Sequence, residues 1–215
     1  MSETTTSIAV FGLQCFWGSE VKFGLQKGVI STSVGYTGGS TPQPTYRQLG
    51  DHTEVVKVVF NDKLITYQEL LDIFWSAHDP TYLFKQQYQS AIYTSDSVQH
   101  QLATELLSAK QSQSSKPIVT KIFQLKQYYL AEDYHQKYFL RKHPEIINEL
   151  GLTDGQLVDS PVASRLNSYC AGFGSRQQFL DDIGQQLSNN KLLINETNQQ
   201  TIIKLINDGP NLGEC

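Results

Sequence analysis

Apolar residues recur along the first half of the chain with the two spacings that distinguish strands from helices. The run 8–13 is typical of a buried strand that leads into a turn. Segments 29–36 and 55–60 are rich in β-branched residues and predict two further strands. Segment 90–94 predicts a short strand, and 118–125 predicts one with alternating apolar and polar positions.

Helical spacing separates these strands. Segment 16–25 predicts a helix directly after the first strand, and 97–111 predicts another after the fourth. Thr66 and Glu69 have the capping-box spacing and open an amphipathic helix over 66–77. The order strand, helix, strand, strand, helix, strand predicts a split βαβ, ferredoxin-like core of the α+β class, with helices on one face of a mixed sheet.

The last third of the chain has weaker patterns. Segment 132–142 predicts a helix, and 158–174, which contains Cys170, has the proline, asparagine and glycine content of a coil. Polar helices are expected near 177–187 and 199–207. We therefore expect a coil-rich C-terminal extension.

Length and composition favour one principal domain. The 215 residues are 39% hydrophobic and 18% charged, which suits one core with appendages. Roughly the last 40 residues are rich in glutamine and asparagine, so we expect 175–215 to be a helical appendage. The net charge of −4, with the 17 basic residues dispersed, predicts no nucleic-acid partner. No apolar run has the length of a membrane span or a signal segment, so we expect no membrane partner and a cytoplasmic protein.

The three cysteines are too few and too odd in number for a disulfide framework. The chain has no Cys-x-x-Cys pair and no histidine cluster with metal-ligand spacing, so we expect neither a metal nor another cofactor. If these cysteines have a function, we therefore expect them to act as reactive thiols.

Cys15 stands where the first predicted strand meets the first predicted helix. A helix N-terminus favours a thiolate, and Phe16 and Trp17 would wall an apolar pocket beside it. The alternative is that Cys15 is a small buried hydrophobe and the two aromatic residues are core. The motifs elsewhere in the chain decide between the two interpretations.

Ordered motifs over roughly 7–174 resemble those of the peptide methionine sulfoxide reductases of the A type. The motifs are Cys15-Phe16-Trp17-Gly18, Gly35-Tyr36-Thr37-Gly38-Gly39, Pro44-Thr45-Tyr46-Arg47, His52-Thr53-Glu54-Val55, His78-Asp79-Pro80-Thr81, Gln87-Tyr88-Gln89-Ser90-Ala91-Ile92-Tyr93 and the segment 128–136. The resemblance implies that 1–174 is the catalytic domain.

What the resemblance implies is reduction of the S epimer of methionine sulfoxide, free or in oxidised proteins, with thioredoxin as the reductant. We expect a monomer. Cys15 would be the nucleophile and would become a sulfenic acid as methionine leaves. Glu54 would be the proton donor, because an apolar pocket raises a carboxyl pKa. Tyr46 and Tyr88 would hold the sulfoxide oxygen, and Phe16 and Trp17 would receive the substrate methyl group.

The chain departs from the family pattern before the cysteine and before Tyr88. Leu13 and Gln14 replace the usual small residues, and the loop from Pro80 to Tyr88 is short and lacks the aspartate often found there. Tyr82 is therefore an alternative to Tyr88. Asp79 is expected to fix its own loop or to join the tyrosine network.

A second thiol must remove the sulfenic acid. Cys170, in the predicted coil, is the expected resolving cysteine, and Cys215 either relays the disulfide to thioredoxin or takes no part.

Two rival functions remain open at this stage. One is a cysteine hydrolase that uses Cys15 with His52 and Asp79. The other is a module that binds oxidised methionine without reducing it.

Overall fold

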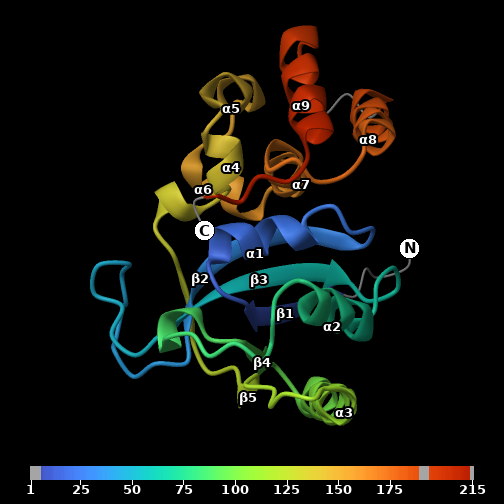
Figure 1. Cartoon of the computed structure of the whole chain (residues 1–215). Helices are drawn as coiled ribbons and strands as arrows, with labels where there is room; N and C mark the ends of the chain where they lie inside the picture. Colours follow the sequence, from blue (N-terminus) through green and yellow to red (C-terminus); the bar gives the residue numbers. More distant parts are fainter. Residues whose placement is uncertain (1–5, 189–193, 214–215) are drawn as a thin grey trace.

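A mixed six-stranded sheet forms the first part of the computed structural model, which describes residues 6–188 and 194–213 (Figure 1). The strand order is β5-β4-β1-β3-β2-β6, and every neighbouring pair is antiparallel except β4 and β5. The strands are β1 (Thr6–Gly12), β2 (Val29–Thr37), β3 (Thr53–Asn61), β4 (Ala91–Thr94), β5 (Lys121–Gln124) and β6 (Tyr128–Leu130).

The inner strands confirm the predicted ferredoxin-like core. Their order, β4-β1-β3-β2, is that of a split βαβ unit, with α1 (Phe16–Phe23) and α2 (Tyr67–Ser76) as its two helices. Phe11 of β1 and its partner Val56 of β3 lie on one face, where they pack with Phe23 of α1 and Phe74 of α2. The two helices therefore cover the same face of the sheet.

The capping box predicted for α2 is present. The Thr66 hydroxyl accepts the Glu69 N–H, and the Glu69 carboxylate accepts the Thr66 N–H. After α2 come the short 3-10 helix η1 (Gln86–Tyr88) and α3 (Ser97–Gln113). Within the residues that the structure describes, no helix is long and apolar enough to cross a membrane.

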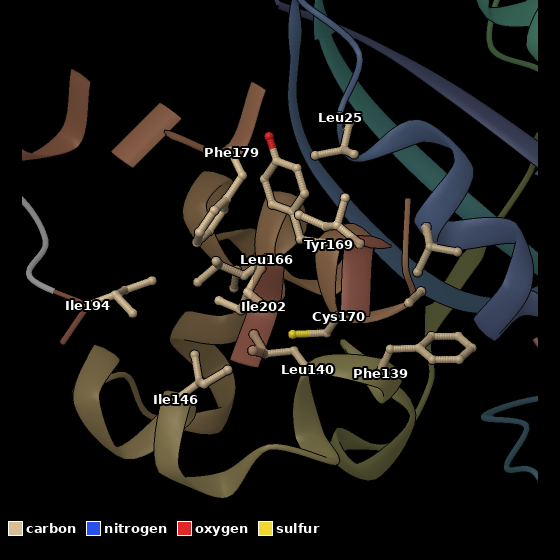
Figure 2. Close-up of a cluster of buried hydrophobic side chains, with 14 of the residues drawn as sticks. Leu25, Phe139, Leu140, Ile146, Leu166, Tyr169, Cys170, Phe179, Ile194 and Ile202 are labelled. Carbon is tan, nitrogen blue, oxygen red and sulfur yellow. The ribbon is translucent and has the colours of Figure 1, made fainter. Parts of the chain in front are cut away.

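The chain from residue 133 onward is helical and packs on the outer side of α1 (Figure 1). Val21 of α1 and Leu25, two residues after α1 ends, contribute to a hydrophobic cluster that these helices build, shown in Figure 2. The helices are η2 (Asp133–His135), α4 (Tyr138–Arg141), α5 (Pro144–Leu150), α6 (Asp154–Asp159), α7 (Pro161–Cys170), α8 (Arg176–Ser188) and α9 (Glu196–Asp208).

The helices expected after residue 174 are α8 and α9, and they contribute to this cluster. Phe179 and Ile202 are fully buried in it, so the expectation that this segment lies outside a core is wrong. The division of the chain at residue 174 stays a prediction.

The coil predicted over 158–174 is wrong, because most of it is helix α7. Ser160 caps the helix by accepting the Ala163 N–H, and Pro161 occupies its first turn, where proline is favoured. Gly172, with φ of +85°, follows the helix end. Pro161 and Gly172, which suggested a coil, therefore mark the two ends of a helix.

The helix predicted over 132–142 is also wrong, because the segment divides into η2 and α4 at Lys137, whose φ is +56°. The Gln136 side chain exchanges hydrogen bonds with the backbone N–H and C=O of Val34. These long-range contacts override the local helical spacing.

A fully buried ion pair anchors α1 from its outer side. Lys137 Nζ lies 2.8 Å from Glu20 Oε1 and also donates to the Thr32 carbonyl at 2.6 Å. The Asn167 amide of α7 donates to Glu20 Oε2 at 3.1 Å. Helix α1, which starts beside Cys15, is thereby held between the sheet and the C-terminal helices.

Candidate active site

A cavity of about 340 Å³ opens where β1 ends and α1 begins. It brings together most of the predicted site residues: the nucleophile candidate, the acid candidate, both tyrosines and the aromatic pair. Its lining residues are Leu13, Gln14, Cys15, Phe16, Trp17, Gly18, Ser19, Lys22, Tyr46, Glu54, Phe84, Tyr88 and Leu212.

Cys15 is half-buried and is the N-cap residue of α1. The positive end of the helix dipole therefore lies beside it. Gln14 before it has a φ of +72°, a left-handed conformation that is uncommon for a residue other than glycine. The Ser19 hydroxyl lies 2.9 Å from the carbonyls of both Leu13 and Cys15 and fixes this turn.

Glu54 lies on β3 in line with Val56, so strand alternation turns its side chain to the face that α1 covers. The carboxylate accepts the Phe16 backbone N–H at 3.2 Å and the Gln87 amide at 2.7 Å. Burial raises the pKa of Glu54 to about 7, against the opposing effects of these two hydrogen bonds and the charge of Lys85. A carboxyl with this pKa holds a proton at neutral pH in a substantial fraction of molecules.

Tyr88 supplies a second protic group at the cavity. Burial, then the charge of Glu54 and a hydrogen bond with Tyr46, raise the pKa of Tyr88 above its ordinary value. Its hydroxyl therefore stays protonated at neutral pH and is a hydrogen-bond donor.

Tyr46 lies on a loop that polar contacts hold in place. Its backbone N–H donates to Glu132 Oε1 at 2.9 Å, and its ring lies 4.8 Å from that of His135. Within the loop, Asp51 accepts the Ser40 N–H at 2.8 Å, which contributes to lowering the pKa of Asp51 to about 2. Tyr46 is 40% exposed, so its hydroxyl can meet a molecule that enters the cavity.

The aromatic wall consists of Phe16, which is buried, and Trp17, which is half-buried. The Trp17 indole stacks on Tyr138, with ring centroids 3.7 Å apart and an interplanar angle of 2°. Its Nε1–H donates to His135 Nδ1 at 3.1 Å, so the imidazole proton is on Nε2. Burial lowers the pKa of His135 and keeps the ring neutral.

Several neighbours of the cavity were not predicted. Phe84 and Leu212 line it, and the Lys22 ammonium, which also lines it, donates to the Ala77 carbonyl at the end of α2. Gln87 touches the acid and stands next to Tyr88 in the sequence, which is the signal that would have identified it. Leu212 carries no local signal, because its place depends on how the C-terminal helices fold back.

Three other candidates lie away from the cavity lining. The Asp79 carboxylate accepts the Thr81 N–H and hydroxyl at 2.9 and 2.7 Å, so it fixes its own loop. Tyr82 is 58% exposed and packs against Phe84. Cys170 is buried among the apolar side chains of the C-terminal cluster (Figure 2), and burial raises the pKa of its thiol. Cys215 lies outside the described residues.

His52 does not have the contacts of a catalytic base. Its Nδ1 accepts the Gly39 N–H at 3.2 Å, and its Nε2 donates to the Thr41 carbonyl at 2.8 Å. Both ring nitrogens therefore hold the Tyr46 loop. A hydrolase that uses His52 as its base is not supported by this arrangement.

No group of three or more histidine, cysteine, aspartate or glutamate residues that could hold a metal ion occurs within 6–188 and 194–213. The cavity instead combines one thiol at a helix N-terminus with a carboxyl that holds a proton near neutral pH. Fold and site define an enzyme that works through a cysteine and a proton donor.

Comparison with known proteins gives the family. The family model described as peptide methionine sulfoxide reductase matches residues 7–157. The peptide methionine sulfoxide reductase of Drosophila melanogaster is 42% identical over 178 residues, which cover 81% of this chain and 72% of the relative. Peptide methionine sulfoxide reductase MsrA of Methanococcus maripaludis is 42% identical over 155 residues, 67% of this chain and 99% of the relative.

The structure of methionine sulfoxide reductase A of Corynebacterium diphtheriae superimposes with a TM-score of 0.57 at 34% identity and covers 66% of this chain and 77% of its own. The chain belongs to the peptide methionine sulfoxide reductase family. Its activity is the thiol-dependent reduction of methionine sulfoxide to methionine. The predicted family and enzyme class are confirmed.

Proposed function

We propose that this protein reduces the S epimer of methionine sulfoxide by attack of Cys15 on the sulfoxide sulfur while Glu54 protonates the oxygen. The observation that carries the proposal is the buried Glu54 carboxyl, with a pKa of about 7, in the same cavity as Cys15. A sulfoxide sulfur becomes electrophilic only when its oxygen is protonated or strongly hydrogen bonded, so nucleophile and acid must act on one substrate together.

Tyr46 and Tyr88 donate hydrogen bonds to the sulfoxide oxygen in this proposal. Their hydroxyls are mutually hydrogen bonded at the cavity, and the Tyr88 hydroxyl keeps its proton at neutral pH. Phe16 and Trp17 form an apolar wall suited to the S-methyl group. Such a wall on one side and donors on the other distinguish the two epimers, because they fix where the methyl group and the oxygen lie.

The reductase step transfers the sulfoxide oxygen to Cys15. The Cys15 thiolate attacks sulfur, Glu54 gives its proton to the oxygen, and the S–O bond breaks as the oxygen passes to the cysteine. Methionine leaves and Cys15 becomes a sulfenic acid, so the substrate gains two electrons and the cysteine loses two. Condensation with a second thiol then releases water and forms a disulfide.

Cys170, the resolving thiol that the sequence suggests, is buried and cannot contact Cys15 in this arrangement. It lies in the last turn of α7 with its thiol in the hydrophobic cluster, so attack on Cys15 requires the end of α7 to open. Leu212 lines the same cavity as Cys15, and Cys215 follows it by three residues, which can span up to about 11 Å when extended. We therefore propose Cys215 as the resolving thiol and Cys170 as a structural cysteine.

A dithiol protein of the thioredoxin type is the reductant we propose, because a disulfide formed in each cycle needs thiol–disulfide exchange to be reopened. We propose both oxidised proteins and free methionine sulfoxide as substrates. The cytoplasmic location and the monomeric state expected from the sequence stay predictions.

The test is reduction of the separate S and R epimers with dithiothreitol as reductant, using wild-type protein and Cys15→Ser. The expected result is consumption of the S epimer alone by wild-type protein and of neither epimer by the variant. Equal consumption of both epimers would contradict the stereochemical assignment. Wild-type activity in Cys15→Ser would contradict the nucleophile.

A further inference from the structure

Gln87 has no role in the reaction as described above, yet its side chain contacts the acid directly. Its Nε2 donates to Glu54 Oε1 at 2.7 Å, and the Phe16 N–H donates to Oε2 at 3.2 Å. Each carboxyl oxygen therefore has a donor from a different element, η1 on one side and α1 on the other. These two contacts determine how the carboxyl is oriented at the cavity.

The turn that carries Gln87 is fastened to the start of β3. The Gln86 amide donates to the Asp51 carbonyl at 2.5 Å, and the Thr53 hydroxyl donates to the Gln86 carbonyl at 3.1 Å. The Tyr88 N–H closes the 3-10 turn on the Lys85 carbonyl at 2.9 Å. The Gln87 amide thus meets Glu54 from a fixed position.

We propose that Gln87 is a positioning residue of the reductase: its amide orients the Glu54 carboxyl and stabilises the ionised form of that carboxyl against burial. This inference rests on the proposed role of Glu54 as the acid. An N–H that donates to a carboxylate favours the charged form, because the anion is the stronger acceptor. Gln87 therefore lowers the pH at which Glu54 loses its proton.

Other groups that face Glu54 also affect its protonation, some favouring the ionised form and some the protonated form. The Lys85 ammonium favours the carboxylate, and its charge lies 4.8 Å from the centre of the Tyr88 ring. The Tyr36 and Tyr88 hydroxyls interact with the Glu54 charge, and the Cys15 thiol lies in the same cavity. Gln87, in contrast, is uncharged and donates a hydrogen bond to the carboxyl itself, so the substitution Gln87→Leu leaves the formal charges at the site unchanged.

The chain offers a matched control in Gln89. Its Nε2 donates to Thr53 Oγ1, also at 2.7 Å, and so makes a similar tie to β3 one residue before Glu54. Gln89 is buried and does not contact the carboxyl through this bond. Because the Thr53 hydroxyl also donates to the Gln86 carbonyl, Gln89→Leu reproduces a general loosening of this turn, whereas a direct effect on the Glu54 carboxyl requires loss of Gln87 itself.

The experiment is a pH profile of the single-turnover rate of methionine release, with protein in excess over methionine S-sulfoxide. The variants are Gln87→Leu, Gln87→Glu and Gln89→Leu, with Glu54→Gln as reference. Gln87→Leu is expected to lower the plateau rate and to move the alkaline midpoint upward by about one to two pH units. Gln87→Glu, which keeps the size but adds negative charge, is expected to move it upward as well.

An unmoved midpoint in both Gln87 variants, or an equal shift in Gln89→Leu, would overturn the role of Gln87. The reference variant separates this failure from failure of the proposed function. If Glu54→Gln keeps the wild-type rate and midpoint, the assignment of the acid itself is wrong. If Glu54→Gln loses the step and the Gln87 midpoints do not move, the assignment of Gln87 alone is wrong.

Discussion

The backbone N–H of Phe16, at the start of α1, donates to Glu54 Oε2 at 3.2 Å. The acid on β3 is thereby tied to the residue that follows the nucleophile. A shift of α1 relative to the sheet would change both the place of Cys15 and the place of the proton. The site consequently depends on contacts that hold α1 from both sides.

The activity should fall as the pH rises through 7. Burial raises the pKa of Glu54 to about 7, so the protonated, proton-donating form is present below this pH and is lost above it. We expect the single-turnover rate to decline above pH 7, with Glu54→Gln slower by about 10²- to 10⁴-fold and without this decline. A decline that persists unchanged in Glu54→Gln would assign it to another group.

Tyr46→Phe and Tyr88→Phe should each slow the reductase step. Each variant removes one hydroxyl at the cavity while keeping the ring, and loss of one transition-state donor costs on the order of 10²-fold. Because the two hydroxyls are hydrogen bonded, the double variant should fall short of the product of the single effects. Measurement of kcat and KM for the four proteins checks this. An unaffected kcat in both single variants would remove the tyrosines from the reaction.

Loss of the buried cation that anchors α1 should destabilise the whole protein. Lys137→Met leaves Glu20 charged and fully buried without its ammonium partner, which costs about 3–5 kcal/mol. Urea unfolding measures the change. Lys204→Met is the control, because the Lys204–Asp208 pair is largely exposed and contributes at most about 1 kcal/mol. Equal losses in the two variants would contradict the anchoring role of Lys137.

Turnover with a thioredoxin-type reductant should depend on Cys215. We expect Cys215→Ala to stop that turnover while a single equivalent of methionine is still released. Cys170→Ala should continue to turn over, because the Cys170 thiol is buried in the C-terminal cluster. The opposite pattern, with only Cys170→Ala inactive, would show that α7 opens and would restore the prediction made from the sequence.

The ferredoxin-like part of the fold, and several of the residues that meet at the cavity, could be predicted from the sequence. The order of the four inner strands and the capping box at Thr66 follow from local patterns, and the meeting of Cys15 and Glu54 in one cavity follows from the ordered motifs. These features depend on short segments whose alternation or capping is strong. The residues that meet in one cavity were recognisable because their motifs resemble, in order, those of the family.

The features that were not predicted depend on contacts between distant segments. Lys137 interrupts a helical pattern because it pairs with Glu20, 117 residues earlier in the chain. Leu212 reaches the cavity because α7 packs on α1 and α9 packs on α7, which brings the end of the chain back toward α1. Cys170 was placed in a coil because 158–174 contains proline, asparagine and glycine, whereas Pro161 occupies the first turn of α7 and Gly172 follows its end.

The role of Cys15 is tested most directly by mass spectrometry after a stoichiometric pulse of methionine S-sulfoxide, given to fully reduced protein without added reductant. The expected result is one equivalent of methionine and a disulfide that contains Cys15, and release of methionine is expected to cease in Cys15→Ser. Methionine release with Cys15 still a free thiol would contradict the account.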